Sequence, residues 1–183
     1  MALLPSVASP MHGAVVPIAY YKVTASGGDY SIDFQNIPSV YQDLQIIMFG
    51  RSTQSVSQGD CYLQLNNDTG TNYSRTLLTG NGSSASSSRS SNDGSAYPFY
   101  MPGASATSGI FGSAILHILN YANTSTYKTL LGRWAADLNG SGGTQELATL
   151  WRSTAAINRL TFTVGNWAQN STVALYGIRT VGQ

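Results

Sequence analysis

The sequence predicts an all-β protein, a single antiparallel β-sandwich with an extended N-terminal arm. Apolar residues alternate with polar ones over short stretches, which is the period of a half-buried strand. Clusters of Gly, Asn, Ser and Asp separate these stretches and indicate turns. No sustained helical pattern interrupts the series. Strands joined by turns in this way are typical of antiparallel sandwiches and barrels.

Residues 1–17 form the predicted arm. Pro5, Pro10 and Pro17 interrupt the segment and its apolar periodicity is weak, so no regular element is expected. Such an arm either frays or lies along a partner molecule. The segment lacks a basic n-region, which argues against a signal peptide. No apolar run reaches 18 residues, so no membrane-spanning segment is predicted.

Alternation predicts the first strands of the sandwich domain, residues 18–183. Residues 30–34 and 61–65 alternate between apolar and polar side chains, as half-buried strands do. Residues 44–50 (LQIIMFG) are apolar on both faces, as expected for a central strand. Cys61 is the one cysteine, so no intrachain disulfide forms, and we expect it to be a buried strand residue.

Residues 80–95 (GNGSSASSSRSSNDGS) contain one alanine and no larger apolar side chain. The segment is either a linker between two small domains or a long loop within one. A linker would leave each half with few strands and exposed sheet edges. We therefore predict a long Ser-rich loop inside one sandwich. Loops of this kind are usually functional surfaces or mobile insertions.

The second half continues the strand pattern. Residues 114–121 (AILHILNY) are again apolar on both faces, and residues 126–138, 160–164 and 172–178 complete the predicted set. Residues 146–160 leave an alternative open. Thr and the flanking Gly residues favour a strand there, but a helical stripe fits Leu147, Leu150, Trp151 and Thr154.

The charge content narrows the function classes. Charged residues make up 9% of the chain, against about 25% in an ordinary soluble protein, and the net charge is +1. No run of Lys or Arg occurs, so the sequence shows no footprint of binding to nucleic acid or to anionic lipid. With 42% hydrophobic residues the chain is expected to fold around a core.

Residues suited to catalysis are few. His12 lies in the arm, and His117 lies in an apolar strand, where a core or interface histidine is expected rather than a catalytic base. Glu146 is the one glutamate, and the seven aspartates are scattered singly, so no carboxylate pair suggests glycoside hydrolysis. No nucleophile-elbow motif accompanies the many serines. We predict that the protein is not an enzyme.

No cofactor or metal is predicted either. Residues 66–70 (NNDTG) offer oxygen ligands but lack the spaced acidic positions of a calcium loop, so an Asx-type turn is expected. No Gly-rich phosphate cradle joins a strand to a helix. Among the aromatic residues, Trp134 and Trp151 suit a large core. Trp167 follows Gly165 and Asn166 in a predicted turn and is the best candidate for an exposed aromatic.

Four segments resemble a known group of proteins. The resemblance rests on an F-x-N-I-P-x-x-Y-x-D-L-Q-I stretch, an N-x-D-T-G-x-N-Y turn, an N-Y-A-N-T-x-x-Y-K-T hairpin and a closing A-L-Y-G-I strand. These features lie within residues 30–53, 63–87, 118–132 and 153–179. Together they resemble the small β-sandwich virion structural proteins of tailed bacteriophages, which serve as head-decoration, head-fibre or tail-associated proteins.

The resemblance implies a jelly-roll-like fold and a position in the virion, on the head or the tail. The short chain favours the capsid surface over the tail, as a decoration or cement protein that stabilises the head by bridging major capsid subunits. The resemblance also implies a homo-oligomer, a trimer, that contacts the major capsid protein or another virion protein. The expected interface is formed by apolar and aromatic residues of the arm and the segment after it: Leu3, Leu4, Val7, Met11, Val15, Val16, Tyr20 and Tyr21.

Two alternatives remain. A tail-associated or fibre-tip module could bind host carbohydrate through Trp167, Tyr97 and Tyr100 beside the Ser-rich segment. A polysaccharide hydrolase would need Glu146 and Asp137 as its acid pair. The chain shows no coiled-coil shaft or fibre repeat, which favours the decoration protein.

Overall fold

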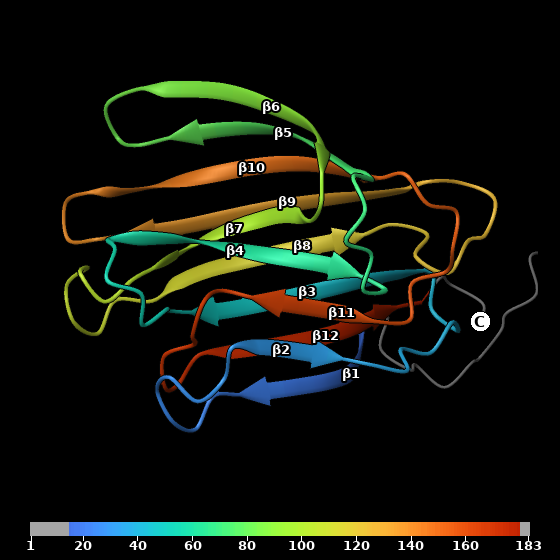
Figure 1. The fold of residues 1–183 in the computed structure, drawn as a ribbon, viewed down its shortest axis with the longest axis horizontal. Helices are drawn as coiled ribbons and strands as arrows, with labels where there is room; N and C mark the ends of the chain where they lie inside the picture. Colours follow the sequence, from blue (N-terminus) through green and yellow to red (C-terminus); the bar gives the residue numbers. More distant parts are fainter. Residues whose placement is uncertain (1–14, 180–183) are drawn as a thin grey trace, which may run out of the picture.

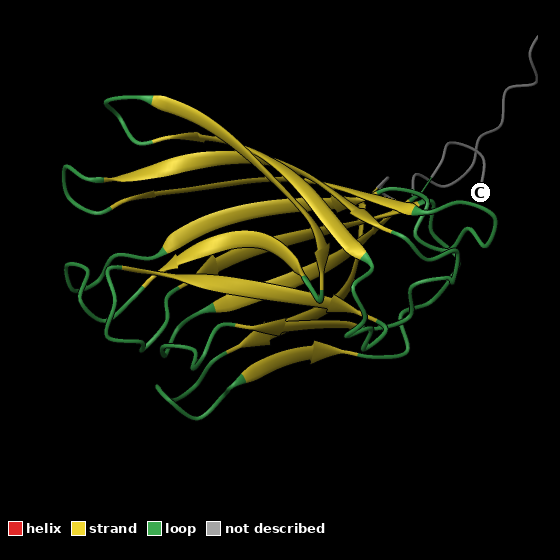
Figure 2. Ribbon diagram, turned by 45° about the horizontal axis from the view of Figure 1, so that its top comes forward, coloured by secondary structure: helices red, strands yellow, loops and turns green. Residues whose placement is uncertain are grey.

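Twelve antiparallel strands form the described part of the chain, residues 15–179 of this computed structural model (Figure 1). No helix occurs within these residues, and Figure 2 shows strands joined by loops throughout. The predicted all-β class is confirmed. The strands are β1 (Val15–Lys22), β2 (Ser31–Phe34), β3 (Asp43–Gly50), β4 (Gln58–Leu65), β5 (Tyr73–Gly80), β6 (Ala85–Asp93), β7 (Ala96–Pro102), β8 (Gly112–Ile118), β9 (Lys128–Asp137), β10 (Gly142–Trp151), β11 (Leu160–Thr163) and β12 (Thr172–Ile178).

The strands form two sheets that pack face to face. The larger sheet has the order β1-β12-β3-β8-β9-β10-β5-β6, and the smaller has the order β2-β11-β4-β7. In Figure 1 the smaller sheet lies in front of the larger one, and β5 and β6 extend beyond it at the top. Side chains from both sheets form one hydrophobic core between them, so the architecture is a β-sandwich.

Eight of the strands have the arrangement of a jelly roll. When the hairpins β5–β6 and β9–β10 are set aside, β1-β12-β3-β8 faces β2-β11-β4-β7, and most connections cross from one sheet to the other. Both hairpins extend the larger sheet past β8, in the order β9-β10-β5-β6. The larger sheet therefore has an outer face eight strands wide.

Alternating side chains explain how the strands build the core. In β3, Leu44, Ile46 and Met48 are buried, while the alternate residues Ile47 and Phe49 point to the opposite face. The predicted central position of this strand is confirmed, because β3 pairs with β12 on one side and with β8 on the other. One apolar face of β3 thus serves the core and the second remains on the outside of the sheet.

The Ser-rich segment is a strand, and the prediction of a long loop is wrong. Residues 85–93 form β6, which pairs with β5 in antiparallel register. The Asn81 side chain accepts hydrogen bonds from the backbone N–H groups of Ser83 and Ser84, at 3.0 and 2.8 Å, and so closes the hairpin. Strand pairing uses backbone groups, so side chains that bury almost nothing can still occupy an edge strand.

The predicted arm overlaps the first strand. Residues 15–17 begin β1, whose backbone pairs with β12 from Val15↔Ile178 to Lys22↔Thr172. Pro17 is tolerated because β1 is an edge strand with an irregularity next to this residue, where a missing N–H group costs no ladder bond. The rest of the predicted arm, residues 1–14, lies outside the described residues.

Residues 146–160, for which a helix was the alternative prediction, form the end of strand β10 followed by a loop that leads to β11. β10 ends at Trp151 and pairs with β9 on one side and with β5 on the other. Leu147 and Trp151 point into the core, as alternate positions of a strand do. The two sheet partners thus decide in favour of the extended conformation.

Candidate interaction surface

The outer face of the larger sheet carries large apolar side chains that are open to solvent. Contiguous exposed apolar patches are uncommon on soluble monomers and mark sites of interaction. Each of these side chains is at least 42% exposed, although the Phe49 ring stacks on Phe111 with the ring centres 4.8 Å apart. We call this set the outer apolar face; it consists of Tyr20 on β1, Ile47 and Phe49 on β3, Leu78 on β5, Ile115 on β8 and Leu131 on β9.

Strand register places part of this face in one straight row. Ile47 pairs with Ile115, Ile115 with Arg133, Arg133 with Glu146, and Glu146 with Leu78. Directly paired residues have side chains about 5 Å apart on the same face of a sheet. The row therefore reads apolar, apolar, positive, negative, apolar across five adjacent strands.

The two charges in this row form an ion pair. The Arg133 guanidinium donates a hydrogen bond to the Glu146 carboxylate, and the two side chains are 73% and 55% exposed. An ion pair this exposed contributes little to the stability of the fold. Its position bears on recognition by a partner, since the pair places one positive and one negative group side by side between apolar residues.

Glu146 was also the acid considered for a hydrolase, together with Asp137. The structure gives the two carboxylates separate partners, because Asp137 accepts a hydrogen bond from the Gly140 N–H at 2.9 Å in the turn between β9 and β10. Within residues 15–179, no group of three His, Cys, Asp or Glu side chains is arranged to hold a metal ion. His12 lies outside the described residues.

A hollow of about 400 Å³ lies beside the row. Gly132 and Leu147 line it with their backbone, because both are inward-facing positions; a Cβ atom at Gly132 would point to the core, 3.0 Å from Cδ2 of Leu147. His117, predicted to be a core or interface histidine, lines the hollow and is half-buried, with its Nε2 atom 3.3 Å from Nε2 of Gln45. The hollow is lined by Ile115, His117, Leu131, Gly132, Arg133, Glu146 and Leu147.

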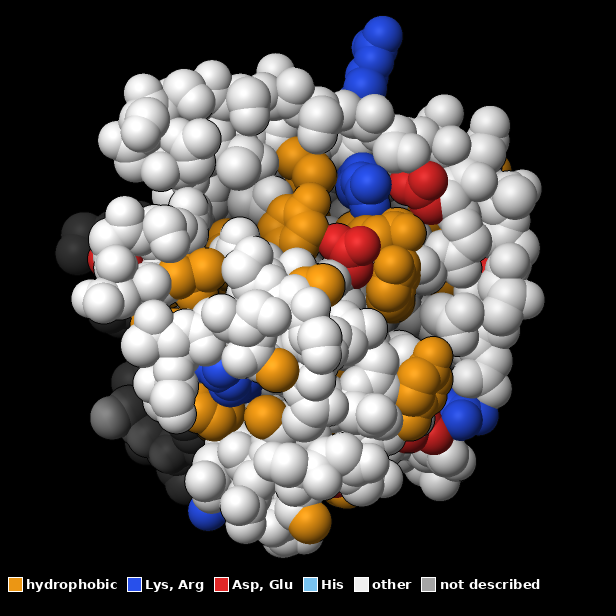
Figure 3. All heavy atoms as spheres, turned by 60° about the vertical axis from the view of Figure 1, so that its left-hand side comes forward, with side chains coloured by type: hydrophobic (Ala, Val, Ile, Leu, Met, Phe, Trp, Pro, Cys, Tyr) orange, Lys and Arg blue, Asp and Glu red, His pale blue; other side chains and the backbone are white. Residues whose placement is uncertain are grey.

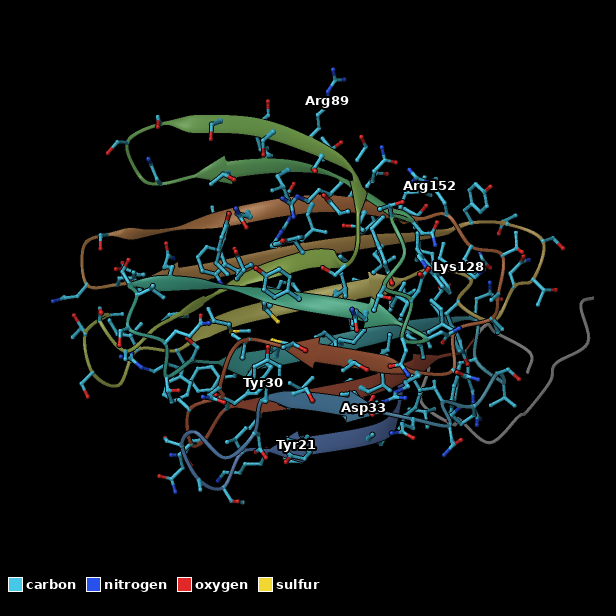
Figure 4. The ribbon with its side chains drawn as sticks, viewed as in Figure 1. Tyr21, Tyr30, Asp33, Arg89, Lys128 and Arg152 are labelled. Atoms are coloured by element: carbon cyan, nitrogen blue, oxygen red, sulfur yellow. The ribbon has the colours of Figure 1, made fainter. Side chains whose placement is uncertain are left out.

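The predicted interface residues that the structure describes lie on β1. Val15 and Tyr20 are exposed, whereas Val16 and Tyr21 are half-buried. Tyr21 packs against the core, and the neighbouring Asp29 carboxylate raises the pKa of its hydroxyl group (Figure 4). Leu3, Leu4, Val7 and Met11 lie outside the described residues. Of the predicted set, Tyr20 thus belongs to the outer apolar face.

Trp167 is not the exposed aromatic that the sequence predicted. Its side chain is 0% exposed, and its ring lies close enough to Gly50 that a Cβ atom there would be 3.1 Å from Cζ3. The backbone N–H of Trp167 donates to the carbonyl of Asp29 at 2.9 Å, and the residue forms an isolated bridge with Ser52. The contacts with Asp29 and Ser52 direct the indole into the core. Both partners are distant in sequence, so the Gly165–Asn166 turn pattern could not predict this burial.

Tyr97 and Tyr100, the other two candidates for a carbohydrate contact, are half-buried on β7. The Arg75 guanidinium lies 3.9 Å from the centre of the Tyr97 ring, and the Tyr62 ring meets Tyr97 edge-on at 4.6 Å. The cavity beside them has a volume of about 10 Å³, the size of one water molecule. This cluster packs the space between the sheets and offers no flat platform for a sugar ring.

Figure 3 shows the end of the sandwich that carries the β5–β6 and β9–β10 turns. Hydrophobic side chains are visible at the centre of this end, with basic and acidic side chains among them, and around them backbone and uncharged side chains, drawn in white, predominate. The scarcity of charged side chains here agrees with the low charge content of the chain, 9% of its residues.

Three residues that could carry chemistry are engaged in structure. Burial raises the pKa of the Cys61 thiol, which makes it a poor nucleophile. Lys128 is buried, its Nζ atom donates to the carbonyls of Thr126 at 2.8 Å and Thr154 at 3.3 Å, and burial lowers its pKa (Figure 4). Asp68 accepts from the Gly70 N–H at 2.8 Å, which confirms the predicted Asx-type turn.

The outer apolar face is the surface that sequence reasoning missed, although its signal was present. Residues 44–50 and 114–121 are apolar on both faces, a pattern that predicts central strands of a sheet. In the structure, both strands are central within the sheet, but only one of their faces meets the core. A doubly apolar strand in an antiparallel sandwich therefore indicates an exposed interaction surface.

Comparisons with protein-family models, with curated proteins and with solved structures find no match for this chain. A search of residues 15–179 for a helix of sufficient length and hydropathy to span a membrane finds none.

Proposed function

We propose that this chain is a non-enzymatic structural protein of a tailed-bacteriophage virion, a decoration or cement protein on the capsid surface. The observation that carries the proposal is the outer apolar face, which spans β1, β3, β8, β9 and β5 on one side of a rigid sheet. A flat apolar surface suits permanent contact with another protein rather than turnover of a substrate. The resemblance of the four sequence segments supplies the virion context.

The physical role of such a protein is to add buried area at junctions between capsid subunits. Burial of apolar surface stabilises an assembly by roughly 25 cal/mol per Å². Each residue of the outer apolar face that becomes covered thus opposes dissociation of the shell. The chain has 9 Lys and Arg residues in 183, so trypsin-like proteases find few cleavage sites on it. Both properties favour durability outside the cell.

The structure argues against the carbohydrate-binding alternative, because its main candidate for a sugar contact, Trp167, is not exposed. Trp167 lies in the core, and Tyr97 is held between Arg75 and Tyr62. A tail position without sugar binding remains an outcome of the experiment that follows, because virion proteins of this architecture are used on both heads and tails.

Gold-labelled antibody raised against the recombinant chain, applied to intact virions that carry its gene, tests the proposal. Label spread over the head is the expected result. Label confined to the tail or its tip would overturn the capsid assignment, and absence of the chain from purified virions would overturn the virion role altogether.

A binding experiment with capsids that lack this protein then tests the surface. The full chain is expected to bind them, and Leu131→Asp is expected to bind at least tenfold more weakly because it places a charge in the outer apolar face. Val40→Asp is the matched control, since Val40 is 63% exposed in a loop away from this face. Equal binding of both variants would mean that another surface makes the contact, such as residues 1–14.

A further inference from the structure

We propose that two copies of this chain associate face to face through the outer faces of β8, β9, β10 and β5, about a two-fold axis that runs parallel to the strands between β9 and β10. The inference concerns the free protein and does not depend on the virion role; because the dimer covers the same outer apolar face that the proposed capsid contact uses, the dimer must dissociate before the chain binds a capsid. It follows from the order of side chains across these four strands, which is complementary to itself when reversed.

The central row shows this self-complementarity. Across the four strands it reads Ile115, Arg133, Glu146, Leu78. The proposed axis exchanges β9 with β10 and β8 with β5. Arg133 of one copy then faces Glu146 of the second copy, and Ile115 faces Leu78. Two reciprocal charge contacts and two reciprocal apolar contacts result, and an isologous interface requires this kind of match.

The next row along the strands matches in size and polarity. It reads His117, Leu131, Ala148, Thr76. Under the same axis the large Leu131 faces the small Ala148, and the polar His117 faces the polar Thr76. On these four strands the row on the other side of the central one contains only small residues, namely Ser113, Ala135, Thr144 and Gly80. On β3 the row continues with the large Phe49, which the axis places opposite the small Ala85 on β6.

The shape of the surface agrees with the side-chain order. Leu78 is 53% exposed on β5, and the hollow of about 400 Å³ extends from β8 over β9 to Glu146 and Leu147 on β10, across the axis. The axis carries Leu78 of each copy to Ile115, which borders the hollow of the other copy on β8. The protruding Leu78 thus meets the β8 edge of the recess.

The contact area is sufficient for a stable dimer. Three strands lie on the shorter side of the axis, namely β10, β5 and β6, so six strands of each copy overlap. With strands about 4.8 Å apart and residues about 3.3 Å apart, six strands of seven residues cover about 29 Å by 23 Å, or roughly 650 Å² from each copy. The total of roughly 1,300 Å² lies in the range of specific protein interfaces.

Charge complementarity favours a second copy over an unrelated partner. The outer faces of β8, β9, β10 and β5 carry Arg133 and Glu146 on adjacent strands in the central row, so a partner needs the opposite order at the same spacing. The chain itself, turned over, presents that order. The resemblance to virion proteins implies a trimer, whereas this face fits a two-fold contact, and the two assemblies differ in mass.

Sedimentation equilibrium of the full recombinant chain provides the first test. A particle of twice 19.4 kDa is expected. A monomer at all concentrations up to the millimolar range, or a trimer, would overturn the proposal. Leu78→Asp should weaken dimerisation at least tenfold, while Val40→Asp should leave it unchanged; both side chains are more than half exposed, so neither change should unfold the chain.

Charge exchange tests the reciprocal contacts directly. Arg133→Glu gives a face with two negative groups, and Glu146→Arg gives a face with two positive groups, so each variant alone should be largely monomeric. An equimolar mixture of the two should form a heterodimer, because each negative group then faces a positive one. Failure of the mixture to associate, with each variant folded by circular dichroism, would contradict the proposed register.

Cross-linking locates the axis. Ile115→Cys combined with Leu78→Cys should give a covalent dimer with a short bis-maleimide, because the axis brings these two positions together. Ile115→Cys alone should not, since β8 of one copy lies three strand spacings, about 14 Å, from β8 of the other along the sheet. Efficient dimer formation by the single variant would place the axis elsewhere and overturn the model.

Discussion

The Arg159 guanidinium holds the Asp33 carboxylate through two parallel hydrogen bonds, from Nε to Oδ1 at 2.8 Å and from Nη2 to Oδ2 at 2.7 Å. The pair joins the start of β11 to β2, which is labelled at Asp33 in Figure 4. Thr161 donates a further hydrogen bond to Oδ1 at 2.9 Å. This bidentate contact fixes the edge of the smaller sheet, where β2 has only four residues.

Asp33→Asn should destabilise the fold at neutral pH by about 1–2 kcal/mol, because the amide cannot accept both guanidinium hydrogen bonds. Burial alone would raise the pKa of Asp33, but the hydrogen bonds from Arg159, Gln35 and Thr161 outweigh burial and lower it below its ordinary value of 3.8. The ionised group therefore stabilises the fold above about pH 4, and this contribution is lost as pH falls through the lowered pKa.

Urea unfolding at pH 7 and at pH 3 measures both effects. The wild-type chain should lose more stability than Asp33→Asn between these two pH values. Equal losses would show that the ion pair does not contribute to acid sensitivity.

Asp68→Ala should cost about 2–3 kcal/mol, because it leaves the indole N–H of a buried tryptophan without its acceptor. The Asp68 Oδ2 atom accepts from Nε1 of Trp151 at 2.7 Å and from Nδ2 of Asn72 at 2.9 Å. Thermal unfolding followed by tryptophan fluorescence measures the loss. Asp137→Ala is the matched control, since Asp137 accepts from one exposed turn N–H and its removal should cost under 1 kcal/mol. Equal losses would contradict a special role for the indole contact.

Gly177→Ala should destabilise the chain by about 1–3 kcal/mol, because a Cβ atom at this position would overlap the Tyr41 ring. Gly177 lies near the end of β12, but it is paired with Val16 on β1 and with Leu44 on β3, so its backbone has little freedom to move aside. Gly28→Ala provides the control, since the nearest atom to its Cβ would be the Ala25 carbonyl oxygen at 3.7 Å, an ordinary contact. Chemical denaturation of both variants decides the point; equal stability would mean that Tyr41 rotates away without cost.

Residues 85–93 should show intermediate protection in hydrogen exchange. Their amides that pair with β5 exchange more slowly than those of an unstructured peptide, because the ladder bonds must open first. They should still exchange faster than residues 142–151, which pair on both sides and bury Trp151. Exchange at the unstructured rate throughout residues 85–93 would instead agree with the loop that composition suggested.

The local sequence pattern was sufficient to predict those structural features that depend only on residues close together in the chain. The alternation of residues 30–34, 61–65 and 160–164 predicted strands that the structure contains as β2, β4 and β11. The NNDTG sequence predicted an Asx-type turn from its residue types, and in the structure the Asp68 side chain accepts a hydrogen bond from the N–H of Gly70, two residues away. In each case the interacting atoms lie within a few residues, so sequence spacing carries the geometry.

The sequence by itself thus determined the all-β class, the two central strands and the Asx turn. The tertiary structure alone decided that residues 85–93 form a strand, that Trp167 is buried and that one face of the larger sheet is open. The physical reason is that each of these depends on a distant partner: the edge of β5, the Ser52 bridge, and the jelly-roll order that covers one face of β3 and β8 while leaving the other to solvent.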